Sequence, residues 1–82
     1  MHYRATWRLV GAGQRVLGRG ELDGVHDGQA DAVAEILAQL QSFAVHGRDE
    51  QRNEWWAKRS SEADLELRFR VEPRTLTGRP IV

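Results

Sequence analysis

Residues 29–44 read QADAVAEILAQLQSFA, and their apolar side chains recur at steps of three or four. This spacing places the apolar residues along one side of a helix. They are Val33, Ile36, Leu37, Leu40 and Ala44. Asp27 is the expected N-cap of this helix, and His46-Gly47 is expected to close it. A single helix cannot bury its apolar side against itself, so strands must cover it.

Four other stretches alternate between apolar and polar residues, as strands with one buried face do. We expect strands over residues 2–10, 15–22, 52–60 and 64–72, joined as two hairpins by turns at 11–14 and 61–63. Residues 48–51 are polar and are expected to form a loop. Pro73 is expected to end the last strand, because it has no N–H for the hydrogen-bond ladder.

The register of each hairpin follows from the pairs that it would bring together. In the first hairpin, Trp7 is expected opposite Gly18, where an aromatic ring can cover a strand glycine. In the second hairpin, Trp55 is expected opposite Leu67, and both would point into the core. Trp56, the next residue, then points to the opposite face of the sheet.

These elements predict an α+β fold of the order β-β-α-β-β, with one four-stranded, largely antiparallel sheet and a single helix packed on one face. The domain is expected to span residues 1–72. Residues 73–82 would be a C-terminal tail, either a short edge strand or unordered. The order of the strands in the sheet stays open. The expected core comprises Tyr3, Trp7, Leu9, Val16, Leu22, Val33, Ile36, Leu37, Leu40, Trp55, Leu65, Leu67, Phe69 and Val71.

Composition narrows the class of protein. The chain has 82 residues, no cysteine and a formal net charge of zero. Disulfides and thiolate metal sites are therefore excluded. Residues 1–10 do not resemble a signal peptide, and no apolar run approaches the roughly 20 residues that span a bilayer. We expect a soluble cytoplasmic protein that does not bind membranes. Because so short a chain has a small core, a homodimer is one expected form.

Catalytic, metal and cofactor sites are not expected. His2, His26 and His46 belong to three different segments and do not form a zinc-like spacing. Asp27 and Asp31 are explained by their place at the start of the helix. The glycine pairs in residues 11–13 and 18–20 are not followed by a helix, so they do not form a phosphate-binding loop. The chain is therefore expected not to be an enzyme.

The sheet face that points away from the helix is the expected working surface. Its candidate partner-binding residues are Trp56, Arg4, Arg8, Leu17, Arg19, Lys58, Arg68 and Arg70. Arginine and tryptophan are enriched at protein–protein hot spots. The same residues could contact phosphates and stack on bases, or the face could simply be solvated. Interleaved acidic residues such as Glu54 and Glu66 count against phosphate binding.

These observations predict a small non-enzymatic protein-binding module of an accessory, regulatory or inhibitor type. It would act through the exposed arginine and tryptophan face or a sheet edge, with a homodimer as one form. The alternative is a nucleic-acid-binding protein that uses the same basic face. The exposed side of the helix carries Asp31 and Glu35, so the zero net charge is expected to conceal a dipolar molecule.

Overall fold

The computed structural model describes residues 2–74. Its elements in chain order are β1 (His2–Val10), the short 3-10 helix η1 (Ala12–Gln14), β2 (Val16–Glu21), α1 (Gln29–Leu40), β3 (Val45–Asp49), β4 (Glu54–Lys58) and β5 (Glu66–Arg74). The predicted tail lies outside the described residues from position 75 onward. Among residues 2–74, no helix is long and apolar enough to cross a membrane.

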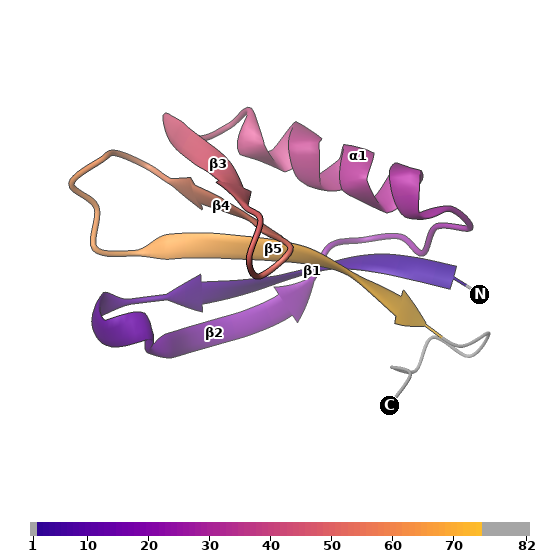
Figure 1. Cartoon of the computed structure of the whole chain (residues 1–82), viewed down its shortest axis with the longest axis horizontal. Helices are drawn as coiled ribbons and strands as arrows, with labels where there is room; N and C mark the ends of the chain where they lie inside the picture. The colour runs from indigo at the N-terminus through magenta and orange to yellow at the C-terminus, as the bar shows by residue number, and fades with distance from the viewer. Residues whose placement is uncertain (1, 75–82) are drawn as a thin grey trace.

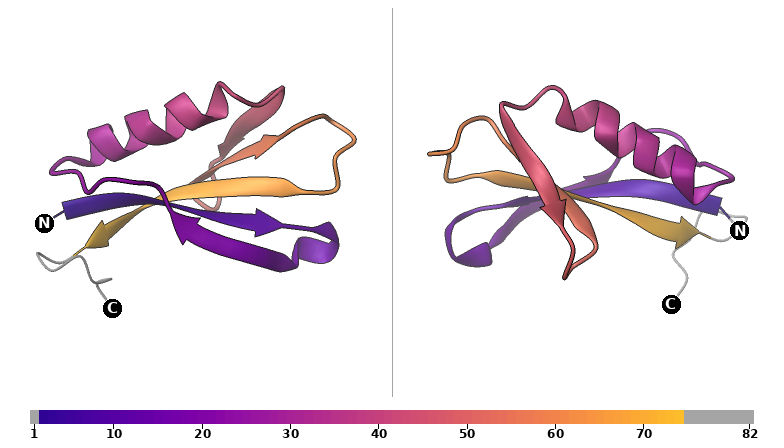
Figure 2. Two further views of the ribbon diagram at one scale, coloured as in Figure 1. Left: turned by 180° about the vertical axis from the view of Figure 1, so that it is seen from behind. Right: turned by 45° about the horizontal axis from the view of Figure 1, so that its top comes forward.

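The five strands form one antiparallel sheet in the order β2-β1-β5-β4-β3. Helix α1 lies across one face of it, over β1, β5 and β4 (Figure 1). The α+β class is therefore confirmed, whereas the expectation of four strands in the order β-β-α-β-β was wrong. The sheet is strongly twisted, and the β3–β4 hairpin is turned steeply relative to β1 and β2 (Figure 2). We call the face under α1 the inner face and the opposite face the outer face.

Strand β3 is the element that the sequence pattern does not show. It occupies the residues expected to close the helix and to start a loop. Its sequence, VHGRD, does not alternate between apolar and polar residues. The apolar side chains that cover β3 come from the two tryptophans of β4. The Arg48 guanidinium lies 4.1 Å from the centre of the Trp55 ring. On the outer face, a Cβ added to Gly47 would lie 2.8 Å from Trp56 Cζ2, so the indole lies directly against the β3 backbone.

Helix α1 ends at Leu40, four residues before the expected end. The chain then turns, with the Phe43 N–H donating to the Leu40 carbonyl at 3.0 Å, and the freed residues lead into β3. The N-cap is Gly28 rather than Asp27. A Cβ added to Gly28 would lie 3.6 Å from Asp31 Oδ2. Asp27 lies one residue earlier and pairs with the His2 ring at 3.1 Å.

Both hairpins are shifted by two residues from their expected registers. Trp7 lies opposite Gly20 instead of Gly18, and Trp55 lies opposite Phe69 instead of Leu67. In the first hairpin the connection is one residue longer than expected, so that Val10 pairs with Val16, and a bulge between the Val10 and Leu9 pairs adds the second residue of the shift. In the second hairpin, the strands end earlier and leave a loop over residues 59–65. A shift of two residues keeps the side chains of residues 18–21 and of the second hairpin on their predicted faces. Val16, which lies beyond the bulge and pairs with Val10, instead lines the outer face.

Pro73 lies inside β5 opposite Tyr3, and the expectation that it ends the strand was wrong. The Tyr3 N–H donates to His26 O at 2.7 Å, and Tyr3 O accepts from His26 N at 2.8 Å. Both backbone groups of Tyr3 therefore point away from β5, so the Tyr3–Pro73 pair is a non-hydrogen-bonded one. Pro73 therefore needs no N–H to pair with β1, and no hydrogen bond between β1 and β5 is lost. Strand β5 continues to Arg74.

The core lies between α1 and the inner face. Its buried members are Ala5, Ile36, Leu40, Ala57 and Phe69, with Trp7, Leu22, Phe43, Trp55, Leu67 and Val71 packed around them. Three expected core residues are instead exposed: Val16, Leu37 and Leu65. The helix is too short to cover the whole inner face. Beyond its end, an apolar groove of about 560 Å³ is lined by residues that include Leu9, Phe43 and Leu65.

Candidate functional site

Three arginines lie in one row across the outer face. Arg8 of β1 is the register partner of Arg19 on β2 and of Arg68 on β5. We call these three residues the arginine row. Like charges directly opposite one another on neighbouring strands destabilise a sheet, so this row needs acidic partners.

Glu54 of β4 is the main acidic partner, and it is wholly buried at 0% exposure. Arg8 donates to both of its carboxylate oxygens, through Nη1 to Oε2 and through Nη2 to Oε1 at 3.0 Å. Arg70 donates to Oε2 from Nε at 2.9 Å and from Nη2 at 2.5 Å. Arg68 Nη1 donates to Oε1 at 3.3 Å. One carboxylate therefore binds arginines from both β1 and β5.

The hydrogen bonds from Arg8 and Arg70 lower the pKa of Glu54 to about 2, although burial of the carboxyl opposes this shift. Glu54 is therefore ionised at neutral pH despite being buried. A buried charge is stable only when it is paired and hydrogen-bonded, and the two forked arginines meet that need. The arginines of the outer face are therefore arranged around a fixed negative charge.

Arg68 has two further acidic partners at the β3 side of the outer face. Its Nη1 donates to Asp49 Oδ2 at 2.7 Å, and its Nε donates to Glu66 Oε2 at 2.6 Å. These carboxylates hold the pKa of Arg68 above its usual range. The hydrogen bond from Arg68 in turn lowers the pKa of Asp49. The guanidinium of Arg68 is therefore paired with carboxylates of the protein itself.

A second charged cluster lies toward the other end of β5. Arg74 is nearly buried, and its Nη2 lies 2.6 Å from Glu21 Oε1 and 3.7 Å from Glu72 Oε2. Arg4 Nε lies 3.1 Å from Glu21 Oε2. The Arg74 hydrogen bond lowers the pKa of Glu21. Two arginines and two carboxylates balance one another here.

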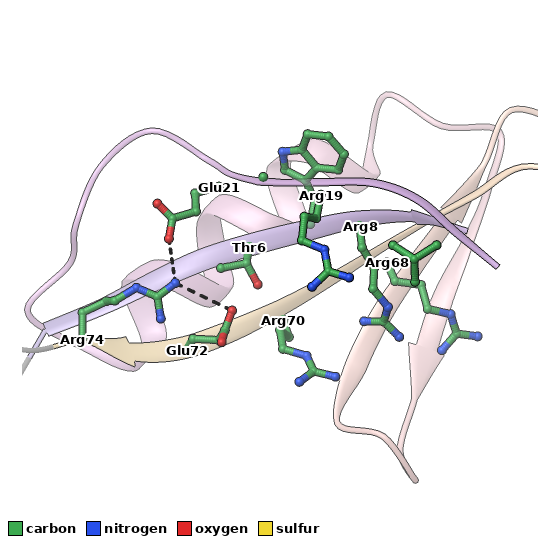
Figure 3. Close-up of a pocket in the computed structure, with 11 residues that line it drawn as sticks. Thr6, Arg8, Arg19, Glu21, Arg68, Arg70, Glu72 and Arg74 are labelled. Atoms are coloured by element: carbon green, nitrogen blue, oxygen red, sulfur yellow. Dashed lines mark hydrogen bonds and ion pairs between the residues drawn. The ribbon is translucent and has the colours of Figure 1, made fainter. Parts of the chain in front are cut away.

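Between these clusters, the outer face is hollowed into a groove of about 480 Å³ (Figure 3). We call it the outer groove. Its lining is Thr6, Trp7, Arg8, Val16, Arg19, Gly20, Glu21, Arg68, Arg70, Glu72 and Arg74. Figure 3 shows the side chains of Arg8, Arg19, Arg68 and Arg70 extending toward the same side, away from the Arg74 cluster. Arg19 forms no salt bridge with any of residues 2–74, unlike the four other arginines of the groove.

The structure brings together half of the candidate residues. Arg8, Arg19, Arg68 and Arg70 line the outer groove, whereas Arg4, Leu17, Lys58 and Trp56 do not. Leu17 is exposed near the β1–β2 turn, and Lys58 lines the apolar groove on the inner face. Trp56 points to the outer face as expected, but it is only partly exposed, because its ring lies against Gly47.

The candidate residues predicted from the sequence left out five polar residues of this site: Thr6, Glu21, Glu54, Glu72 and Arg74. Glu54 was expected on the outer face as one of its interleaved acidic residues, but its complete burial was not predicted. The alternation that placed it beside arginines could have suggested a buried ion pair, but only the twist of the sheet shows that Arg8 reaches it from two strands away. Arg74 was missed because the strand was expected to end at Pro73.

The chain matches no protein-family model, no curated protein and no solved structure in the comparisons with known proteins. Within residues 2–74, no group of three or more His, Cys, Asp or Glu residues is placed to hold a metal ion.

Proposed function

We propose that the chain is a small, non-enzymatic protein-binding module of an accessory, regulatory or inhibitor type, and that it binds its partner through the outer groove. The observation that carries this proposal is the fixed set of arginines around the buried carboxylate of Glu54. Side chains that are already held by ion pairs lose little conformational entropy when a partner docks. Arginine is also among the residues that contribute most to protein–protein binding.

The same contacts disfavour the alternative, a nucleic-acid-binding face. Arg8, Arg68 and Arg70 are already paired with Glu54, so they offer less positive charge to a chain of phosphates. Glu21 and Glu72 line the groove and would repel a polyanion. Stacking platforms generally present two or three aromatic side chains, whereas Trp56 lies against Gly47 and does not line the groove.

A second copy of the chain is a protein partner that the open sheet edges could accept. Among the five strands described, β2 and β3 each have only one neighbour. Val16 and Leu17 of β2 are exposed apolar residues on such an edge. Light scattering at high micromolar concentration tests this part of the proposal. A mass near twice 9.3 kDa supports it, and a monomer contradicts it.

We place the protein in the cytoplasm, since a small domain without cysteine needs no oxidising compartment for its stability. The proposed function is tested by selecting ligands for the immobilised protein from a random peptide display library. Selected peptides should lose binding to Arg70→Glu and keep binding to Asp31→Lys, which changes a charge on the helix side. Failure to select any peptide, or selection of peptides that ignore Arg70→Glu, would contradict the proposal.

A further inference from the structure

We propose that the outer groove recognises a carboxylate on an acidic segment of the partner, and that this carboxylate binds between Arg19 and Arg70. This inference rests on the proposed function and adds the chemistry of the recognised group. Arg19 comes from β2 and Arg70 from β5, on either side of β1, and both line the groove. The side chain of Arg70 is 46% exposed although it contacts Glu54, so part of its guanidinium faces the groove.

The balance of charges favours a ligand with few negative charges. Arg8, Arg68 and Arg70 are matched by three carboxylates, those of Glu54, Asp49 and Glu66. The Arg74 cluster is also neutral, with two arginines and two glutamates. Among the described residues, every arginine of the arginine row and of the Arg74 cluster has an acidic partner except Arg19. One bound carboxylate would complete the pairing.

The geometry of the arginine row keeps Arg19 available. Gly18 and Gly20 flank it on β2, and the Trp7 ring lies against Gly20 on the inner face, so Arg19 is held facing outward. Its cross-strand neighbour Arg8 cannot pair with it and is itself held by Glu54. The planar forks of arginine suit carboxylate oxygens, which can accept two parallel hydrogen bonds.

The acidic end of the groove limits how far an anionic ligand can extend. Glu21 and Glu72 line it, and their side chains are 40% and 37% exposed. A long polyanion that filled the groove would meet these carboxylates, whereas a peptide can place an uncharged residue there. The groove therefore fits an acidic peptide better than a nucleic acid.

The test is a fluorescence anisotropy titration at low salt with a labelled peptide of alternating Glu and Gly residues. A matching Gln and Gly peptide and a labelled oligothymidine serve as comparison probes. Arg19→Gln should weaken binding of the Glu peptide at least tenfold. Arg15→Gln is the matched control, because Arg15 is also exposed, lies four residues away and is outside the groove. Unchanged thermal unfolding would show that both variants remain folded.

The proposal is supported if the Glu peptide binds more tightly than the Gln peptide and only Arg19→Gln weakens it. Equal weakening by both variants would overturn it, because that result indicates attraction to general positive charge. Equal binding of the Glu and Gln peptides, or no binding of the Glu peptide, would also overturn it, while the peptide selection could still support the proposed function. Tighter, Arg19-dependent binding of oligothymidine would overturn both.

Discussion

Arg70 donates two hydrogen bonds, of 2.9 and 2.5 Å, to one oxygen of Glu54, a carboxylate with no exposed surface. Arg8 reaches the same carboxylate from the strand beyond β5. Glu54 therefore joins β4 to β5 and β1 on the outer face, while the apolar core joins these strands on the inner face. The outer face is thus part of what stabilises the sheet as well as the candidate binding surface.

Acid should destabilise the protein through Glu54. Its pKa is about 2 in the folded state against 4.5 for a free glutamate, so the unfolded state takes up the proton first as pH falls. The stabilising contribution is fully present above about pH 5 and is lost as pH falls toward 2. A shift of this size corresponds to about 3 kcal/mol. Urea unfolding at pH 7, 5, 4 and 3 measures it, and a free energy of unfolding that stays constant over this range would contradict the assignment.

Replacing Glu54 by Gln should destabilise the protein by about 3–5 kcal/mol at pH 7, because the buried arginine contacts lose their charged partner. The variant should also lose most of the dependence of stability on pH between 5 and 3. Glu62→Gln is the matched control, since Glu62 is exposed in the β4–β5 loop, and it should change stability by less than about 0.5 kcal/mol. Equal effects of the two variants would show that Glu54 is not buried among arginines.

The two glycines of β2 test the register of the first hairpin. A Cβ at Gly20 would lie 2.7 Å from Trp7 Cζ2, whereas a Cβ at Gly18 would meet Trp7 only at 3.9 Å. Gly20→Ala should therefore cost roughly 1–3 kcal/mol through overpacking. Gly18→Ala should be neutral or slightly stabilising. Thermal unfolding of both variants decides between the observed register and one in which Trp7 faces Gly18, for which the order of effects would be reversed.

Two neighbouring residues of α1 test which side of the helix meets the sheet. Ile36 is fully buried, whereas Leu37 is 45% exposed. Ile36→Ala should cost about 2–5 kcal/mol, and Leu37→Ala should cost clearly less. Chemical denaturation of the two variants measures the difference. Similar losses would mean that α1 is rotated about its axis relative to this arrangement.

The period of residues 29–44 and the alternation of the flanking segments were enough to predict the fold class and the face on which most side chains lie. They could not predict β3, because an edge strand without apolar alternation is indistinguishable from a polar loop until Trp55 and Trp56 are known to cover it. They also could not set the registers, since a shift of two residues preserves every face. The registers are set by the bulge in the first hairpin and by the length of the loop in the second.

The candidate site was predictable only in part. Alternation placed Arg8, Arg19, Arg68 and Arg70 on one face, and all four line the outer groove. The burial of Glu54 depends on the twist of the sheet and on the long Arg8 side chain, which reaches Glu54 across β5. The alternation of apolar and polar residues predicts neither feature. Continuation of β5 through Pro73 depends on the backbone of Tyr3 facing His26, a contact between segments far apart in the sequence.

We propose that the outer groove binds an acidic segment of a protein through Arg19 and Arg70. The most direct measurement is an NMR titration that follows the arginine Nε–Hε signals while the Glu and Gly peptide is added to the unmodified protein. The signals of Arg19 and Arg70 should shift together and saturate, while that of Arg48, which lies over Trp55 on the inner face, should stay in place. Shifts confined to α1 or to the apolar groove, or no saturable shift at Arg19, would contradict the claim.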